Sequence, residues 1–389
     1  MFLYISSFEE LDKAPGIEKK IRGQVKFIND IIDKGVLIYA KNGKIFCEEI
    51  NNLKCKTKKI IFSALSADSM KLLYYFKVYN YLQKFDLMSK EKTIKLAYFR
   101  FSTIDFFILM ILNILKKYKW RIILEIPTYS FKNEWKKAKL KGLYKLFHYY
   151  LLGVLFFKKV DLIVCIGAKP KIDIILKGYF DKMIVINNGI DLDEIRMLKI
   201  NINEYKKEIN LIGIANVAYW HGYDRVIQGL ANFYKNTFNK DLVYFHIVGE
   251  GECINNLKNL VKYLKLDNFV KFYGLKANYE LDLLISKCDI AVGSLGLHRI
   301  GGGNPLKHRE YCARGIPFIY AGDDPGFYNG FPYALKVKSD DSPISIEDVI
   351  DFYKKIKSKY PNYNIEMREY AKNNFDWKII MEKLIYRVL

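Results

Sequence analysis

The stretch LGLHRIGGGNPLKHREYCARGIP, residues Leu295–Pro317, decides the fold. A predicted strand ends just before it, three glycines follow, and a helix is expected to begin near Pro305, since proline is tolerated in the first turn of a helix. Strand, glycine-rich loop and helix form a unit whose ligands bind at the carboxyl end of the strand. The amides of such a loop and the positive end of the helix suit a phosphate or diphosphate.

Two charged side chains lie one turn apart on this predicted helix. Lys307 and Glu310 are three residues apart and therefore share a face. A lysine can neutralise phosphate, and a carboxylate can accept hydrogen bonds from ribose hydroxyls. A surface glycine loop beside an ordinary intrahelical ion pair would give the same pattern, so spacing alone leaves both interpretations open.

Two earlier strand ends carry related signals. VGEGE, Val248–Glu252, is a turn with two glycines, although any strand-to-helix turn can use glycine. IANVAYWHGYDR, Ile214–Arg225, places His221 and Arg225 after another strand and near a helix start. Both are candidate phosphate contacts, with a structural role as the alternative.

Outward from these turns, strands and helices alternate along the whole chain. This spacing is typical of βαβ units and predicts an α/β protein with parallel sheets. A length of 389 residues suits two such domains. We expect Rossmann-like domains at residues 1–190 and 200–370, facing a central cleft, with 371–389 as a closing helix.

The net charge of +21 is unevenly distributed. Residues 1–200 hold 37 Lys and Arg against 20 Asp and Glu, and residues 51–150 alone hold 21 against 6. A one-sided basic surface predicts an anionic partner. In the expected helix 133–150, lysines alternate with aromatic residues, which suits an acidic lipid surface; a helix with an aromatic core face and solvated lysines is the alternative. These lysines are Lys136, Lys137, Lys139, Lys141 and Lys145, and they lie among Leu140 and the aromatic residues Trp135, Tyr144, Phe147 and Tyr149.

The sequence also argues against a membrane-spanning helix, a signal peptide and a zinc site. The longest apolar runs, 106–115 and 149–157, are shorter than the roughly 20 residues that a spanning helix needs. The N-terminus lacks the basic region of a signal peptide, and the six cysteines have no zinc-ligand spacing. We therefore expect a cytoplasmic protein, peripheral on the membrane, without metal or other cofactor.

These motifs resemble the retaining nucleotide-sugar glycosyltransferases of the GT-B fold, family 4, which includes bacterial capsule, O-antigen and exopolysaccharide enzymes. The resemblance extends over nearly the whole chain, from the Gly16 loop and LEIPTYS (124–130) to FDWKIIMEKL (375–384). It implies a metal-independent transferase that moves a sugar from a nucleotide-sugar onto a lipid-linked or polysaccharide acceptor. It also implies that the last helix crosses back onto the N-terminal domain.

The resemblance assigns roles to particular residues. Glu310 matches the second of two family glutamates, the ribose binder, whereas the first falls at Gly302 and is missing. Asn216 and His221 stand where many members have an Arg and a Lys, so His221, Arg225 and Lys307 are expected to stabilise the leaving group. The remaining expected donor contacts are Gly249, Gly251, Gly301, Gly302, Gly303, Asn304 and Asn216, and the acceptor-side residues are Gly16, Arg100, Thr128 and Tyr129.

Three rival functions remain open. A nucleic-acid binder would explain the charge, but no nucleic-acid-binding motif accompanies it. An NAD-dependent enzyme is disfavoured because no G-x-G-x-x-G follows the first strand. A non-catalytic relative that binds nucleotides or sugars is suggested by the missing first glutamate.

Overall fold

The protein is described by a computed structural model that covers residues 1–11, 15–52, 54–64, 66–85, 94–127, 132, 135, 139–167, 173–198, 208–235 and 241–389. The chain divides into two compact domains. The N-terminal domain contains Met1–Gly189 together with Trp377–Leu389, and the C-terminal domain contains Ile190–Asp376. No helix among the described residues is both long and apolar enough to cross a membrane.

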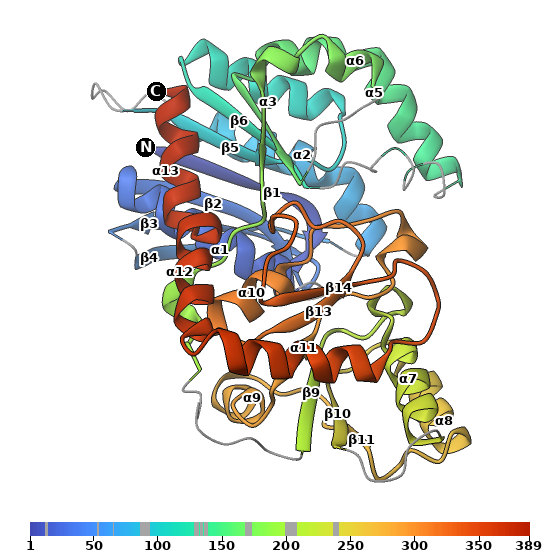
Figure 1. The fold of residues 1–389 in the computed structure, drawn as a ribbon. Helices are drawn as coiled ribbons and strands as arrows, with labels where there is room; N and C mark the ends of the chain where they lie inside the picture. Colours follow the sequence, from blue (N-terminus) through green and yellow to red (C-terminus); the bar gives the residue numbers. More distant parts are fainter. Residues whose placement is uncertain are drawn as a thin grey trace. The chain divides into compact units, whose positions relative to one another are not determined.

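The N-terminal domain is built on an eight-stranded sheet in the order β4-β3-β2-β1-β5-β6-β7-β8 (Figure 1). All neighbouring strands are parallel except at β3, which is antiparallel to both β2 and β4. The strands are β1 (Phe2–Glu10), β2 (Lys34–Lys41), β3 (Lys44–Asn51), β4 (Lys54–Ser63), β5 (Leu96–Arg100), β6 (Arg121–Ile126), β7 (Leu162–Ile166) and β8 (Met183–Ile186).

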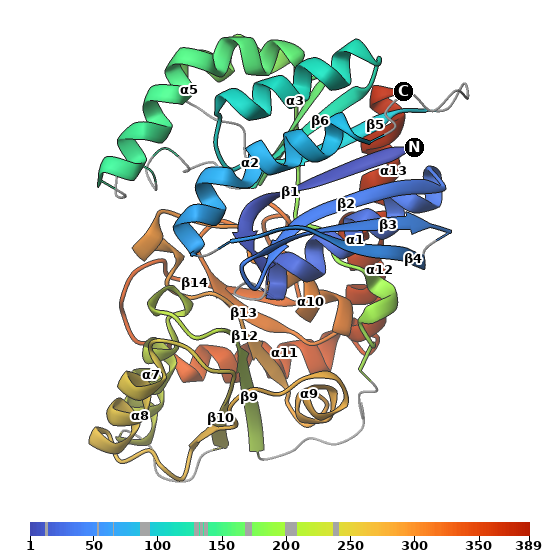
Figure 2. The same cartoon turned by 180° about the vertical axis from the view of Figure 1, so that it is seen from behind.

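Alternate residues of each strand feed two separate cores, because successive side chains of a strand point to opposite faces. Leu3 and Ile5 of β1 pack with α2, α3 and α5, which Figure 2 shows together, while Phe2 and Tyr4 pack with α1 and α13. The domain is therefore a three-layer sandwich. Its helices are α1 (Pro15–Ile31), α2 (Ala67–Gln83), α3 (Phe106–Lys117), α5 (Lys139–Lys159), α6 (Ile174–Lys177) and the closing α13 (Trp377–Val388).

The closing helix α13 confirms the expected return of the chain to the N-terminal domain. Trp377, Met381 and Leu384 are buried in the same core as Ile21 and Val25 of α1. The Trp377 ring covers Gly189, where an added Cβ would lie 2.6 Å from it, so glycine is required at this point.

The C-terminal domain has a six-stranded parallel sheet in the order β11-β10-β9-β12-β13-β14. This is the doubly wound order 3-2-1-4-5-6, in which the chain reverses direction between the first and fourth strands. The fold prediction of two Rossmann-like domains is thus confirmed. The strands are β9 (Glu208–Ile214), β10 (Leu242–Val248), β11 (Val270–Phe272), β12 (Ile290–Val292), β13 (Phe318–Ala321) and β14 (Ala334–Val337).

Helices cover both faces of this second sheet. One core joins the strands to α7, α8 and α11, and the other joins them to α9, α10 and α12. These helices are α7 (Tyr223–Lys235), α8 (Ile254–Tyr263), α9 (Asn278–Ile285), α10 (Leu306–Arg314), α11 (Ile346–Lys359) and α12 (Tyr363–Phe375), with short 3-10 turns η4 (Tyr219–His221) and η5 (Leu297–Ile300) near the carboxyl edge.

Candidate active site

The candidate site lies at the switch point of the C-terminal sheet, where the loops after β9 and β12 separate in opposite directions. Ligands of doubly wound sheets bind at this place. The two loops are joined by backbone hydrogen bonds, from Leu295 N to His221 O (3.0 Å) and from Gly296 N to Trp220 O (3.2 Å). Gly222 makes this approach possible, since its φ is +67° and a Cβ there would lie 2.8 Å from Gly296 N.

Lys307 and His221 come together beside this junction. Lys307 lies in the first turn of α10 and donates to Tyr223 Oη at 3.2 Å. Burial lowers its pKa to about 7, with Glu310 acting in the opposite direction. Helix α10 begins after Pro305 without a side-chain cap, so its first-turn amides have no side-chain acceptor.

His221 is uncharged in this arrangement. Its Nδ1 lies 3.0 Å from Ala218 N and 3.2 Å from Ala218 O, so the tautomer decides which of the two backbone groups it bonds. Burial, together with the positive charge of Lys307, lowers the pKa of His221 to about 3. His221 therefore contributes a neutral imidazole to the site rather than a positive charge.

Glu310 lies on the same helix, one turn beyond Lys307, and is partly buried. The two residues therefore lie on one helix, as their spacing predicts, and Glu310 follows Lys307 toward the C-terminal end of α10. Asn216 is exposed in the loop after β9, next to Gly251. Contacts of Glu310 and Asn216 with a donor stay predictions.

The glycines 249 and 251 have a clear packing role. An added Cβ at Gly249 would lie 1.8 Å from Ala215 O, and one at Gly251 would lie 2.4 Å from Val217 N. Both have positive φ, at +120° and +146°. They let the turns after β9 and β10 pack closely, which is sufficient reason for glycine at both positions whether or not a donor also touches them.

The glycine-rich loop differs from its expected form. The amides of Gly301 and Gly302 donate to His298 O (3.3 Å) and Leu297 O (2.9 Å), so they close the η5 turn rather than point freely at a phosphate. No atom lies within 4 Å of a Cβ built on either glycine, and both line a cavity of about 660 Å³. Gly303 and Asn304 connect this loop to α10.

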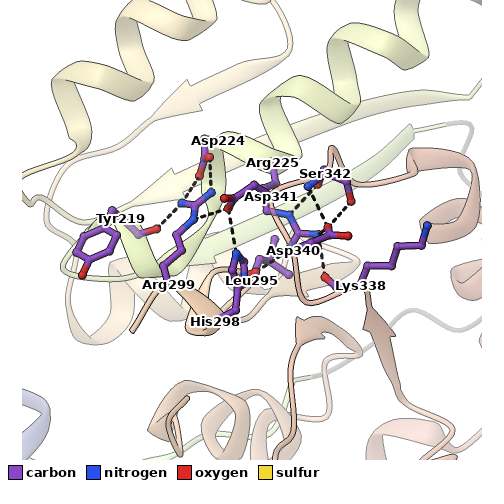
Figure 3. A network of polar contacts seen from close by, with 10 residues as sticks. All are labelled: Tyr219, Asp224, Arg225, Leu295, His298, Arg299, Lys338, Asp340, Asp341 and Ser342. Atoms are coloured by element: carbon purple, nitrogen blue, oxygen red, sulfur yellow. Dashed lines mark hydrogen bonds and ion pairs between the residues drawn. The ribbon is translucent and has the colours of Figure 1, made fainter. Parts of the chain in front are cut away.

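The geometry favours a structural role for Arg225. Its side chain is only 1% exposed, and Figure 3 shows the guanidinium among backbone carbonyls of two loops, which follow β12 and β14. The expectation that Arg225 stabilises the leaving group is not supported by this placement. The guanidinium donates to Ser342 O (2.8 Å), Leu295 O (2.5 Å) and Lys338 O (2.9 Å).

Sequence reasoning missed a second arginine that organises the same loops. Arg299 pairs with Asp224 at 2.7 Å and with Asp341 at 2.7 Å, and it donates to Tyr219 O at 2.6 Å (Figure 3). Its partners are 42 to 80 residues away in sequence. No local pattern could have identified it.

In the N-terminal domain, Gly16 and Arg100 lie near the corresponding switch point, between β1 and β5. Gly16 is exposed in the first turn of α1, and Arg100 is buried at the end of β5. Arg100 influences Glu125, whose pKa is lowered by Lys20 and Arg100 against the opposing effect of burial. Thr128 and Tyr129 lie outside the described residues.

In helix α5, the structure corrects the expectation that all the aromatic residues face a lipid surface. Trp135, just before it, and Tyr149 are buried in the core, so neither can reach a lipid surface. Tyr144 and Phe147 are exposed, as expected for an interfacial face. Exposure extends further along the helix than the lysine pattern indicated, to Tyr150, Leu151, Val154 and Leu155. Lys136 and Lys137 lie outside the described residues.

Comparison with solved structures gives the same two-domain fold over the whole chain. HepE from Anabaena, crystallised with UDP and glucose, is 13% identical with a TM-score of 0.62, covering 99% of this chain and 98% of its own. Sucrose-phosphate synthase from Thermosynechococcus elongatus is 12% identical with a TM-score of 0.60, covering 99% and 98%. The lipopolysaccharide outer core galactosyltransferase WaaB is 13% identical with a TM-score of 0.59, covering 100% of both chains.

Sequence comparison matches the C-terminal domain to a known family. No curated protein matches the chain in sequence. Residues 195–330, which include the β9 loop, the glycine-rich loop and α10, match the sequence model of glycosyl transferases group 1. The domain that carries the candidate site is therefore similar in sequence to the glycosyl transferases group 1, and the whole chain has the two-domain fold of the solved structures described above.

Proposed function

We propose that the C-terminal domain binds a nucleoside diphosphate sugar with its diphosphate between η4 and the start of α10. The observation that carries this proposal is the convergence of Lys307, the neutral imidazole of His221 and a helix N-terminus without a side-chain cap at the sheet's switch point. Glu310, one turn along α10, is then in place for the ribose hydroxyls. Asn216, Gly303 and Asn304 border the same region and complete the proposed donor contacts.

The proposed reaction breaks the bond between the anomeric carbon and the diphosphate oxygen. Negative charge grows on the departing diphosphate, where preorganised donors and cations stabilise the transition state by several kcal/mol. The acceptor hydroxyl oxygen bonds to the anomeric carbon on the face that the diphosphate leaves, and its proton passes to a phosphate oxygen. Configuration is therefore retained, and no protein base is needed. No metal is expected in this reaction.

The donor nucleotide is proposed to be UDP-linked. Three structures similar to this chain contain UDP, UDP with glucose, or UDP-glucose, all in HepE. The acceptor is proposed to be a lipid-linked or growing cell-surface glycan, held by Gly16, Arg100, Thr128 and Tyr129 of the N-terminal domain. Arg100 is buried beside Glu125 and Lys20. Its part in acceptor binding is proposed from its position at the end of β5.

Donor choice is tested with UDP-glucose, UDP-galactose, GDP-mannose and ADP-glucose, measured by thermal shift and by slow hydrolysis of the donor. We expect a UDP-sugar to raise the melting temperature and to be hydrolysed. Binding without hydrolysis, or without transfer to any glycan acceptor, would favour the non-catalytic relative. Failure of every sugar nucleotide to bind, with tight binding of RNA or DNA, would instead favour the nucleic-acid binder.

We further propose that α5 docks on the acidic face of the cytoplasmic membrane. Leu143, Phe147, Leu151 and Val154 recur at helical spacing, and each is more than half exposed. Fully burying such a side chain contributes roughly 1.5–3 kcal/mol. Lys158 and Lys159 end the helix, and each lysine near an anionic surface adds about 1 kcal/mol. Docking would confine the enzyme and a lipid-linked acceptor to one surface.

Vesicle sedimentation tests this surface. We expect binding to vesicles with acidic phospholipid, weak binding to neutral ones, and release by high salt. Phe147→Glu with Leu151→Glu should abolish sedimentation, as should Lys136, Lys137, Lys139 and Lys141 changed together to Glu. The control is Tyr263→Glu, a still more exposed aromatic position on α8 of the other domain. Wild-type protein that stays in the supernatant at low salt would contradict the proposal.

A further inference from the structure

Lys307 occupies an unusual place for a cation. Its Nζ lies 3.2 Å from Tyr223 Oη and 5.4 Å from the centre of the Tyr223 ring, and that tyrosine is 1% exposed. The amine also lies at the start of α10, where the helix dipole is positive and disfavours a second positive charge. Tyr223 offers an uncharged hydroxyl, and the attraction of Glu310, one turn along the helix, only partly opposes the effect of burial.

The titratable groups around Lys307 come from three elements. His221 and Tyr223 face it from η4 and α7, while Glu310 and His308 share its own helix. His308 is hydrogen-bonded to Asp324, whose carboxylate also pairs with Arg309. Within the part of the chain that the structure describes, no carboxylate oxygen forms an ion pair with Lys307 Nζ.

Whether the Lys307 amine is charged therefore depends on the ligand. A buried charge is strongly disfavoured unless a partner compensates it. In the free protein, burial lowers the pKa of Lys307 to about 7 against the attraction of Glu310, so the amine titrates near neutral pH. A diphosphate would add two negative charges beside an amine that has no ion pair with a carboxylate among the described residues.

We propose that Lys307 takes up a proton when the donor diphosphate binds, so that donor binding and protonation of this side chain are coupled. The inference rests on the proposed function, because it requires a diphosphate beside α10. Tyr223 is the positioning residue that holds the amine toward the site. Lys307 becomes a full cation when the anion arrives.

The direction of the pH dependence follows from linkage. A bound diphosphate stabilises the charged amine and raises the pKa of Lys307 above its value in the free protein. Between these two values the complex holds more protons than the free protein, so affinity falls as pH rises. His221, with a pKa of about 3, and Tyr223, whose pKa burial raises well above 10, do not change charge in that range.

Calorimetry with UDP-glucose tests the coupling directly. Titrations at one pH in buffers of different ionisation enthalpy give the number of protons bound with the ligand. UDP-glucose is the suitable probe because both of its phosphates are esterified, whereas a terminal phosphate titrates near pH 6. We expect uptake of about half a proton at pH 7, approaching one at pH 8, and an affinity that falls nearly tenfold per pH unit above neutrality.

Two variants complete the experiment. Lys307→Arg keeps the positive charge at all these pH values, so it should bind UDP-glucose with no proton uptake and a nearly flat pH profile. Lys287→Arg, at an exposed position after α9, should behave as the wild type. UDP-glucose binding without proton uptake in the wild type would overturn this inference and leave the proposed function intact. Absence of binding by UDP-glucose, GDP-mannose and ADP-glucose would overturn both.

Discussion

Two lysines, one in each domain, illustrate how differently the molecule treats a positive charge. Lys20 of α1 is buried and lies 2.7 Å from Glu125 Oε1 and 2.9 Å from Asn188 Oδ1. Glu125 accepts further hydrogen bonds from Gln24 (2.7 Å) and Tyr98 (2.8 Å). Lys307 of α10 is partly buried and has only the Tyr223 hydroxyl among its described hydrogen-bond partners. One charge is neutralised within the fold, and for the other we propose an anionic ligand as the partner.

The comparison of Lys20 with Lys307 distinguishes a lysine that is buried as part of the fold from one that is partly buried at a proposed ligand site. Burial lowers the pKa of both amines, and in Lys20 the attraction of Glu125 opposes that effect. A perturbed lysine is therefore not by itself a sign of a site, because structural ion pairs perturb pKa values as well. What distinguishes Lys307 is that no described carboxylate forms an ion pair with it, at the ligand-binding edge of a sheet.

The largest effect is expected from breaking the pair in the N-terminal domain. Glu125→Ala leaves Lys20 buried without its partner, which should lower the free energy of unfolding by about 3–5 kcal/mol. Urea unfolding followed by tryptophan fluorescence measures this, since Trp120, Trp135 and Trp377 all lie in that domain.

The matched control for Glu125→Ala is an exposed ion pair in the same sheet. Glu49 lies 3.7 Å from Lys59, and both side chains are well exposed, so Glu49→Ala should cost no more than about 1 kcal/mol. The pKa of Glu125 is lowered in the folded state, so its contribution is present above the unfolded pKa and is lost as pH falls. Equal costs for the two variants would contradict the comparison.

An intermediate effect is expected at Glu310 in the C-terminal domain. Glu310→Ala should remove a charge-assisted hydrogen bond to the donor ribose, worth about 1.5–3 kcal/mol, and lower donor affinity at least tenfold. The fold should survive. Calorimetry with UDP measures the loss, and Glu280→Ala on exposed α9 is the control. Unchanged affinity in Glu310→Ala would refute the ribose assignment.

The smallest effect is expected from removing metal ions. The proposed site uses amides, a lysine and a histidine, so transfer activity should persist in excess EDTA. The residues that the structure describes contain no group of three or more metal-ligating side chains, and Asp323 and Asp324 pair with Lys336 and Arg309. A rate lost in EDTA and restored by Mg²⁺ or Mn²⁺ would show that a cation, rather than Lys307, neutralises the leaving group.

Local sequence patterns identified most elements but missed an edge of the first sheet. The hairpin of β2 and β3 was not predicted, although its turn is Asn42–Gly43, with φ of +49° and +68°. This dipeptide is the strongest short-range hairpin signal. Helix α2 was missed as well, because Tyr, Phe and Leu occupy several of its faces and leave no clear amphipathic period.

The sequence by itself determined the two α/β domains, the glycine-rich loop before α10 and the spacing that places Lys307 and Glu310 on one helix. These features depend on local periodicity, glycine positions and helix geometry, all of which act over a few residues. Only the tertiary structure decided that Arg225 bonds to carbonyls of distant loops and that Gly301 and Gly302 use their amides within η5. It also decided that Lys20 pairs with Glu125, whereas Lys307 forms no ion pair with a carboxylate of the described residues. Hydrogen bonding and charge compensation depend on groups brought together by folding from far along the chain, and local sequence carries no record of them.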